Sequence, residues 1–316
     1  MLTYFQIFSA QREPSPAVSP AFMSDMDLYA LFRFFYKGFS NIPNIGRPCM
    51  TIFHLLIVAV IQGLTEFLPI SSSGHLVLLP SLTGMADQGL AIDVAVHVGT
   101  LLAVILYFWA DVRMGLAGVP RMVTGRIDTP GARLAFLLLI ATLPAIAVGL
   151  VLKLTGLSEA MRSVAVIGWT MLLFGLLLYW ADQKGPSTRQ AADWSLPDAV
   201  KMGLWQAVAL IPGVSRSGIT ITAGRMLGYG RHDAAKLSML MSIPTIMASG
   251  SLLALDVVGQ ANSQLLRDSA IAAGFAFVAA LLALSLMMRL LRSVSFTPYV
   301  IYRVVLGVVL LAIAYL

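Results

Sequence analysis

Two polar segments, each inside an otherwise apolar stretch, carry the side chains of this sequence that could do chemistry. The first holds Glu66 and the run Ser-Ser-Ser-Gly-His at 71–75, and the second holds Ser-Arg-Ser-Gly-Ile-Thr at 215–220. Hydroxyls, close glycine backbone and an arginine fork are groups that bind phosphate oxygens. A helix start after each run would add free N–H groups and a partial positive charge. The two segments therefore predict one cavity that grips a phosphorylated head group.

Four residues of these segments are predicted to be catalytic. An arginine between apolar half-helices is costly unless it has a task, which makes Arg216 a candidate to hold phosphate. Ser72 and His75 lie three residues apart, so both can face one side of a helix as a nucleophile and its base. Glu66 completes the catalytic set. The predicted phosphate-binding residues share a hydroxyl group and are Ser71, Ser73, Ser215, Ser217 and Thr220.

A divalent cation is a further prediction for the first segment. Gln62 lies four residues before Glu66, on the same helix face. A carboxylate and an amide oxygen could hold Mg²⁺ or Ca²⁺, with water and diphosphate oxygens as the other ligands. The alternatives are a protonated, hydrogen-bonded Glu66 in the core and a structural pair between Glu66 and Arg216.

Structural roles compete with these functional ones. Thr220 could bond its own helix backbone, and the serines could cap their own helices. A lone histidine on an apolar segment more often has a satisfied core role, which is our interpretation of His54 and His97. His232 is expected on the solvated surface, and the single cysteine, Cys49, is expected to be inert.

The composition indicates a membrane protein. Of 316 residues, 58% are hydrophobic and only 11% are charged, with a mean hydropathy of +0.85. A soluble domain carries about 25% charged residues. The net charge of +6 comes from basic residues in short loops, which fits the positive-inside rule better than a nucleic-acid partner.

The predicted fold is an all-α polytopic membrane protein with six full transmembrane helices and two re-entrant helical hairpins. A span needs about 20 apolar residues. Segments of this kind lie at 91–110, 131–153, 163–181, 237–257, 269–290 and 297–316. The stretches 53–84 and 196–228 are broken by Pro69 and by Pro212-Gly213, so each is predicted to form two half-helices around a polar loop.

The loop charges predict an inverted-topology repeat. The basic loops at 111–133, 182–201, 225–236 and 289–303, which include Arg225 and Arg303, should face the cytoplasm. Hairpin 53–84 then enters from outside and hairpin 196–228 from inside, and three spans follow each. The units are repeat 1 at about 53–181 and repeat 2 at about 196–316. The chain is expected in the bacterial inner membrane, with its site open to the periplasm.

Residues 50–316 are interpreted as a single membrane-embedded domain. Residues 1–49 hold no apolar run of 18 residues and no signal-peptide pattern. We expect either a disordered extension or a misplaced gene start, with translation beginning at Met50.

Two long motifs resemble the undecaprenyl-diphosphate phosphatases, the BacA/UppP family. Residues 62–75, Gln-Gly-Leu-Thr-Glu-Phe-Leu-Pro-Ile-Ser-Ser-Ser-Gly-His, are similar to its first signature, and residues 212–220, Pro-Gly-Val-Ser-Arg-Ser-Gly-Ile-Thr, to its second. The stretches 241–244 and 302–307 also look familial. The first motif of the family begins with Glu or Gln, and Gln62 here removes one carboxylate.

The resemblance implies an activity and a substrate. Undecaprenyl diphosphate would be cut to undecaprenyl phosphate and inorganic phosphate on the outer face, with Mg²⁺ or Ca²⁺. This recycles the lipid carrier of cell-wall synthesis and gives bacitracin resistance.

Several questions stay open at this level. A flippase or transporter of phosphorylated polyprenyl lipid would need the same anion cavity and uses inverted repeats too. A base beside a hydroxyl, as in Ser72 and His75, favours the hydrolase.

The nucleophile can be Ser72, His75 or water. The oligomeric state is not set by the sequence, and a homodimer stays among the alternatives.

Overall fold

The fold is a bundle of helices. The computed structural model describes residues 51–83, 88–157, 161, 163–257 and 263–316, so the predicted N-terminal extension at 1–49 lies outside the described residues. The regular elements within them are helices, together with one isolated β-bridge between Arg189 and Tyr229. In chain order the helices are α3 Ile52–Phe67, α4 Ser72–Thr83, α5 Gly89–Tyr107, α6 Trp109–Val123, α7 Pro130–Thr155, α9 Val164–Lys184, the short 3₁₀ helix η3 Ala191–Asp193, α10 Leu196–Val208, α11 Arg216–Met226, α12 Arg231–Val257, α13 Ser263–Leu290 and α14 Thr297–Tyr315.

Five of the described helices are long and apolar enough to cross a membrane, which confirms a multi-pass pattern. They are α5, α7, α9, α13 and α14. The sixth predicted span, 237–257, forms part of α12 (Arg231–Val257) and is not among these five. Two of its serines, Ser238 and Ser242, are fully buried. A helix that turns polar groups toward protein rather than lipid can carry such residues.

Both predicted helix breaks are present. Before the first, Leu68 has extended backbone (ψ 142°), the conformation that a following proline favours. The second follows Val208 and contains Gly213 at φ 85°, a left-handed conformation that suits glycine. The stretch 53–84 is thus α3 and α4, and 196–228 is α10 and α11.

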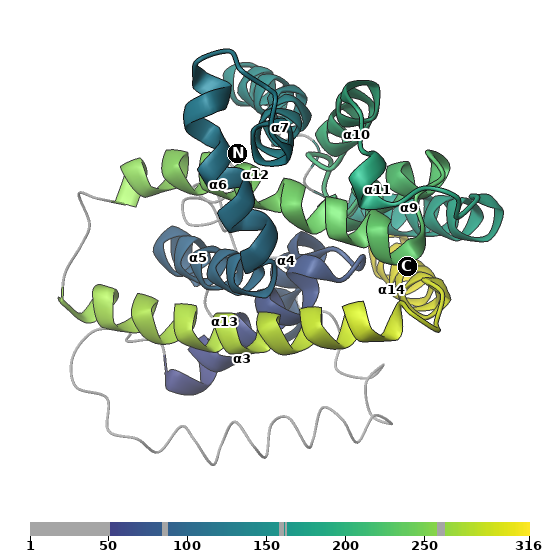
Figure 1. Cartoon of the computed structure of the whole chain (residues 1–316). Coiled ribbons are helices and arrows are strands. Elements are labelled where there is room, and N and C mark those ends of the chain that lie inside the picture. Colours follow the sequence, from purple (N-terminus) through teal and green to yellow (C-terminus); the bar gives the residue numbers. More distant parts are fainter. Residues whose placement is uncertain (1–50, 84–87, 158–160, 162, 258–262) are drawn as a thin grey trace.

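The first half-helix of each broken pair packs closely on a long helix from the other half of the chain. A Cβ on Gly63 of α3 would lie 2.6 Å from Ala279 Cβ on α13, and a Cβ on Gly203 of α10 would lie 2.7 Å from the Ala141 carbonyl on α7. In Figure 1, α3 with α13 and α10 with α7 occupy the bottom and top of the view, and α4 and α12 lie between them. The two breaks are thereby directed toward the same central region.

The central core joins both halves of the chain. Its buried members include Phe67, Val104, Leu178, Met239 and Leu284, from α3, α5, α9, α12 and α13. Large apolar side chains also cover the outer faces of α7, α9 and α14, as lipid contact requires.

One loop prediction was incomplete and two arginine placements were wrong. Much of the predicted loop at 111–133 belongs to α6, whose Gly118 lies against the backbone of Gly131 on α7. Arg225 is buried in the last turn of α11, where its guanidinium bonds the carbonyls of Gly185 and Tyr229 instead of facing water. Arg303 is fully buried in α14. Counting charges along a sequence cannot separate a loop arginine from one in an adjacent helix turn that reaches buried carbonyls.

Candidate active site at the two helix breaks

Glu66, near the end of α3, is the point at which the two polar segments meet. Its side chain is buried and accepts hydrogen bonds on both oxygens. Ser72 Oγ and Gln62 Nε2 each donate to Oε2 over 2.9 Å, and Arg216 Nη2 donates to Oε1 over 3.1 Å. Arg216 lies 150 positions further along the chain. The structure therefore brings together three of the four predicted catalytic residues around one carboxylate.

The two donors from outside α3 occupy the same place in their helices. Ser72 is the first residue of α4, and Arg216 is the first residue of α11. Each follows a serine with positive φ, Ser71 at 73° and Ser215 at 72°. A non-glycine residue in this region costs of order 1–3 kcal/mol and often marks a functional site. The first-turn N–H groups of a helix lack partners in the helix, so a helix start is a place where an anion can bind. Two such starts lie beside the Glu66 carboxylate.

The serine hydroxyls of the two runs have matching local contacts. Ser71 and Ser73 pair at 3.3 Å between their Oγ atoms, and Ser215 and Ser217 pair at 3.2 Å. Ser215 Oγ also accepts from the Gly218 N–H, which is the capping role weighed above. Ser217 Oγ donates to the Leu68 carbonyl over 2.9 Å and so links the second break to the first.

Thr220 bonds its own helix and a residue that the sequence did not single out. Its hydroxyl donates to the Arg216 carbonyl over 2.8 Å and lies 2.6 Å from Ser238 Oγ on α12. The Ser238 carbonyl accepts a longer bond, 3.4 Å, from Arg216 Nη1. Ser238 thus contacts the predicted phosphate-binding arginine and threonine, and as a serine within an apolar helix it carried little signal in the sequence.

His75 lies one turn into α4 and contacts α14. Its Nδ1 is 2.8 Å from the Ser71 carbonyl, and its Nε2 is hydrogen-bonded to the Tyr302 hydroxyl. The two rings stack with centroids 5.5 Å apart and an angle of 8°. Among the contacts of the described residues, the Ser72 hydroxyl is bonded to Glu66 and not to His75. Tyr302 was noted in the sequence only through the family resemblance.

His97 is a second residue whose place the sequence did not reveal. It belongs to α5, and its Nδ1 is 2.7 Å from the carbonyl of Asp93 one turn earlier. Its Nε2 lies 3.9 Å from Glu66 Oε2, with 29% of the side chain exposed. The sequence predicts a core role for this histidine, whereas the structure places it, partly exposed, at the edge of the site.

The donor set around Glu66 fits one divalent cation with few protein ligands. No cluster of three or more His, Cys, Asp or Glu side chains occurs in the described part of the chain. However, Gln62 is fully buried, and its Oε1 has no hydrogen-bond partner among the residues that the structure describes. An unsatisfied buried acceptor beside a carboxylate suits a cation that keeps most of its ligands from water and phosphate oxygens.

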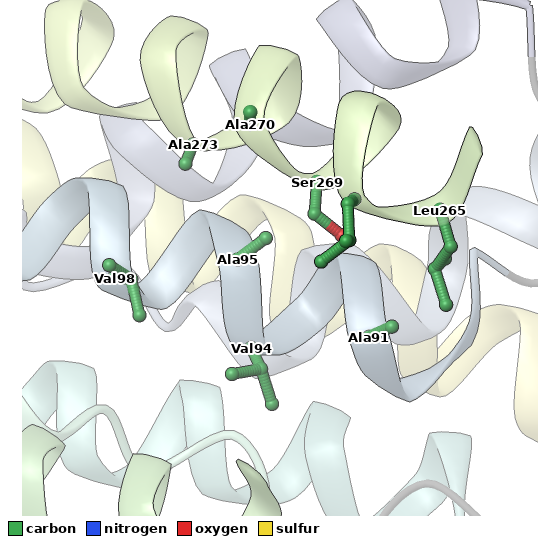
Figure 2. Close-up of a pocket in the computed structure, with 9 residues that line it drawn as sticks. Ala91, Val94, Ala95, Val98, Leu265, Ser269, Ala270 and Ala273 are labelled. Atoms are coloured by element: carbon green, nitrogen blue, oxygen red, sulfur yellow. The ribbon is translucent and has the colours of Figure 1, made fainter. Parts of the chain in front are cut away.

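An apolar pocket lies away from these residues. It has a volume of about 310 Å³ and runs between α5 and α13. Figure 2 shows Val94, Val98, Leu265 and neighbouring alanines along it, with Ser269 as its one hydroxyl. No ionisable side chain lines it, in contrast to the region around Glu66.

Comparisons with known proteins agree on one family. A family model described as "Bacitracin resistance protein BacA" matches residues 55–309. The "Undecaprenyl-diphosphatase" of Dinoroseobacter shibae is 73% identical over 266 residues, which are 84% of this chain and all of the relative. That of Ruegeria pomeroyi is 70% identical with the same coverage. The "Undecaprenyl-diphosphatase 1" of Rhodospirillum rubrum is 47% identical over 273 residues, 84% of this chain and 96% of the relative.

Proposed function

Because this chain belongs to the family of the bacitracin resistance protein BacA, we propose that it hydrolyses undecaprenyl diphosphate to undecaprenyl phosphate and inorganic phosphate. The observation that carries the proposal is the contact of Ser72 and Arg216 with the two oxygens of Glu66. A hydroxyl on a carboxylate acceptor, beside a guanidinium fork and two helix starts, suits phosphoryl transfer, where positioning and charge stabilisation do most of the work.

The membrane setting matches a lipid substrate. The described part of the chain has five helices long and apolar enough to cross a membrane, and the site is polar and largely buried. The polyprenyl chain can stay among the lipids while its diphosphate enters the site. We place this site at the outer face of the bacterial inner membrane, where hydrolysis returns the lipid carrier for cell-wall synthesis. High levels of such an enzyme would confer bacitracin resistance.

Phosphate binding is assigned first to Arg216. Among the described residues, its Nη1 makes one long hydrogen bond, to the Ser238 carbonyl, and can turn toward a phosphate oxygen, while Nη2 holds Glu66. A guanidinium fork binds two phosphate oxygens at once. The first-turn N–H groups of α4 and α11 and the hydroxyls of Ser71, Ser73, Ser215, Ser217 and Thr220 complete the set.

Ser72 is assigned as the nucleophile. Its Oγ forms a bond to the terminal phosphorus, and the bond from that phosphorus to the bridging oxygen breaks, so undecaprenyl phosphate leaves with the bond's electron pair. The hydroxyl proton goes to Glu66 Oε2, its hydrogen-bond acceptor. Water then attacks the phosphoserine and releases inorganic phosphate, and Glu66 returns its proton to Ser72 Oγ.

His75 is assigned the proton of the attacking water. Nδ1–H donates to the Ser71 carbonyl, which sets the orientation of the imidazole. Nε2 is then the nitrogen that accepts the proton, and the Tyr302 hydroxyl that bonds it must turn away for this step. Glu66 and the Gln62 Oε1 would hold Mg²⁺ or Ca²⁺, which when bound offsets the negative charge of the diphosphate. Attack by water itself, or through a phosphohistidine at His75, is the alternative to the serine route.

Phosphate release by the purified protein tests the proposal. Wild type in detergent with undecaprenyl diphosphate and Mg²⁺ should release phosphate, and Arg216→Ala should lose activity by about 100-fold or more. Arg292→Ala, an exposed arginine, is the matched control and should retain activity. A folded wild type that binds the lipid but releases no phosphate would refute the hydrolase and favour the lipid transporter.

A further inference from the structure

Arg303 on α14 is a buried cation that the proposed chemistry does not use. Its side chain is fully buried, and it makes five hydrogen bonds, each to a main-chain carbonyl. None of the ion pairs within the described residues includes it. Burying a charge without a counter-ion is expensive, so the arginine needs a reason to be there.

The five carbonyls come from three segments that meet at the site. Nη1 donates to Pro69 in the first break (3.3 Å) and to Val214 in the second (3.0 Å). Nη2 donates to Gly213 in the second break over 3.1 Å. The remaining bonds reach the Thr170 and Met171 carbonyls on α9. One side chain therefore holds both breaks against each other.

Two glycines leave the room that this guanidinium occupies. A Cβ on Gly175 of α9 would lie 3.2 Å from Arg303 Cβ and 3.4 Å from its Nε. A Cβ on Gly218, in the first turn of α11, would lie 3.0 Å from Nη1. These contacts are tighter than ordinary packing, so an alanine at either position would push the side chain.

We propose that Arg303 is a positioning residue that sets Ser72 and Arg216 on Glu66, an assignment that rests on the proposed function. The carbonyl of Pro69 lies just before Ser71 and Ser72, and that of Val214 lies just before Ser215 and Arg216. Fixing these carbonyls fixes where α4 and α11 begin, and with them the first residue of each helix. The shape of the guanidinium matters as well as its charge, because it must donate hydrogen bonds to the two breaks and to α9 at the same time. Ser217 provides a second, weaker tie through the Leu68 carbonyl.

The first test measures backbone order and does not depend on activity. Hydrogen–deuterium exchange of the purified full-length protein would be compared for wild type, Arg303→Lys and Arg303→Met. We expect exchange to rise about tenfold or more in peptides covering both 70–76 and 213–219 in the two variants, because local opening becomes easier in both breaks. If Arg303 had only a local packing role, the two variants would show faster exchange in α9 and α14 and unchanged exchange in the two breaks.

The second test separates turnover from substrate binding. Misaligned reacting groups lower kcat more than they weaken ground-state binding, so kcat of Arg303→Lys should fall about 10- to 100-fold with KM changed by about threefold or less. The kcat of Arg303→Met should fall further than that of Arg303→Lys, since methionine also lacks the positive charge. Gly175→Ala keeps every proposed catalytic group, and we expect a drop of about 3- to 10-fold in kcat. Gly274→Ala, where the new methyl meets nothing within 4 Å, should leave kcat unchanged.

The outcomes are distinct. Full activity in folded Arg303→Lys and Arg303→Met, or unchanged exchange in both breaks, would overturn the positioning role. Full rescue of kcat by lysine would also overturn it, because the charge alone would then suffice. A wild type that releases no phosphate would refute the proposed function, and the exchange experiment would still decide whether Arg303 holds the two breaks.

Discussion

Ser72 and Arg216 bind opposite oxygens of the same carboxylate, and each is the first residue of a helix that begins after a serine in left-handed conformation. The two residues belong to different halves of the chain and differ in charge. One is suited to attack phosphorus and the other to hold its oxygens. Two helices that begin in the same way thus place residues with different proposed roles at Glu66.

Removing the Ser72 hydroxyl should abolish the covalent route. We expect Ser72→Ala to lower the initial rate of phosphate release by about 100-fold or more, since the nucleophile is lost. Ser285→Ala is the matched control, because within the described residues that hydroxyl bonds the Leu281 carbonyl of its own helix and no other group. Acid quenching during turnover should trap an acid-stable phosphoserine in wild type. Near-normal turnover of Ser72→Ala would instead indicate attack by water or an acid-labile phosphohistidine at His75.

A carboxylate at position 62 should strengthen cation binding. EDTA should remove activity from wild type and Mg²⁺ should restore it. In Gln62→Glu the second carboxylate faces Glu66, and the Mg²⁺ concentration for half-maximal activity should fall about 3- to 10-fold. Gln264→Glu is the control, because Gln264 bonds Asp268 in the same i, i+4 arrangement at an exposed site. Activity of wild type that survives EDTA would contradict the cation proposal.

The close packing of α3 on α13 should be sensitive to a single methyl group. A Cβ on Gly63 would lie 2.8 Å from the Ala276 carbonyl as well as against Ala279, and neither backbone can move freely. We expect Gly63→Ala to lower the free energy of unfolding in detergent by about 1–3 kcal/mol through overpacking. Gly250→Ala, with nothing within 4 Å of the new methyl, should change it little. Equal stability of the two variants would show that α3 does not approach α13 this closely.

Acid should weaken a cluster at the start of α10. Burial alone would raise the pKa of Asp198, but hydrogen bonds from Arg189, Ser195 and Tyr229 outweigh it and lower the pKa to about 2, from an ordinary value of 3.8. The carboxylate therefore contributes stability above pH 4, and this contribution is lost as the pH falls toward 2.

Thermal unfolding between pH 7 and pH 2 measures this contribution. Asp198→Asn should lose on the order of 1–2 kcal/mol at pH 7, after allowance for partial solvent screening, and should depend less on acid than wild type. Asp268→Asn, which accepts one bond from its own helix, is the control. An unchanged acid dependence in Asp198→Asn would contradict the assignment.

Local chemistry in the sequence indicated the helices and their breaks, and it selected the residues that we propose for the site. Pro69 and Pro212 lie in the two breaks, each close to a polar run rich in serine and glycine, and proline removes an N–H and restricts the residue before it. Proline alone did not decide the breaks, because Pro144 and Pro244 lie inside α7 and α12. Runs of about 20 apolar residues predict spans. The motif residues from Gln62 to His75 and from Ser215 to Thr220 were recognisable as a set before any contact was known.

Only the tertiary structure decided which of these residues touch. The spacing of Ser72 and His75 suggested a pair, but the break after Phe67 directs Ser72 to Glu66 and leaves His75 to Tyr302. His97 and Arg303 reach the region of the site from α5 and α14 through packing between distant segments. Such contacts depend on how helices from the two halves of the chain pack against each other. The periodicity and the charge count of a single segment do not predict that packing.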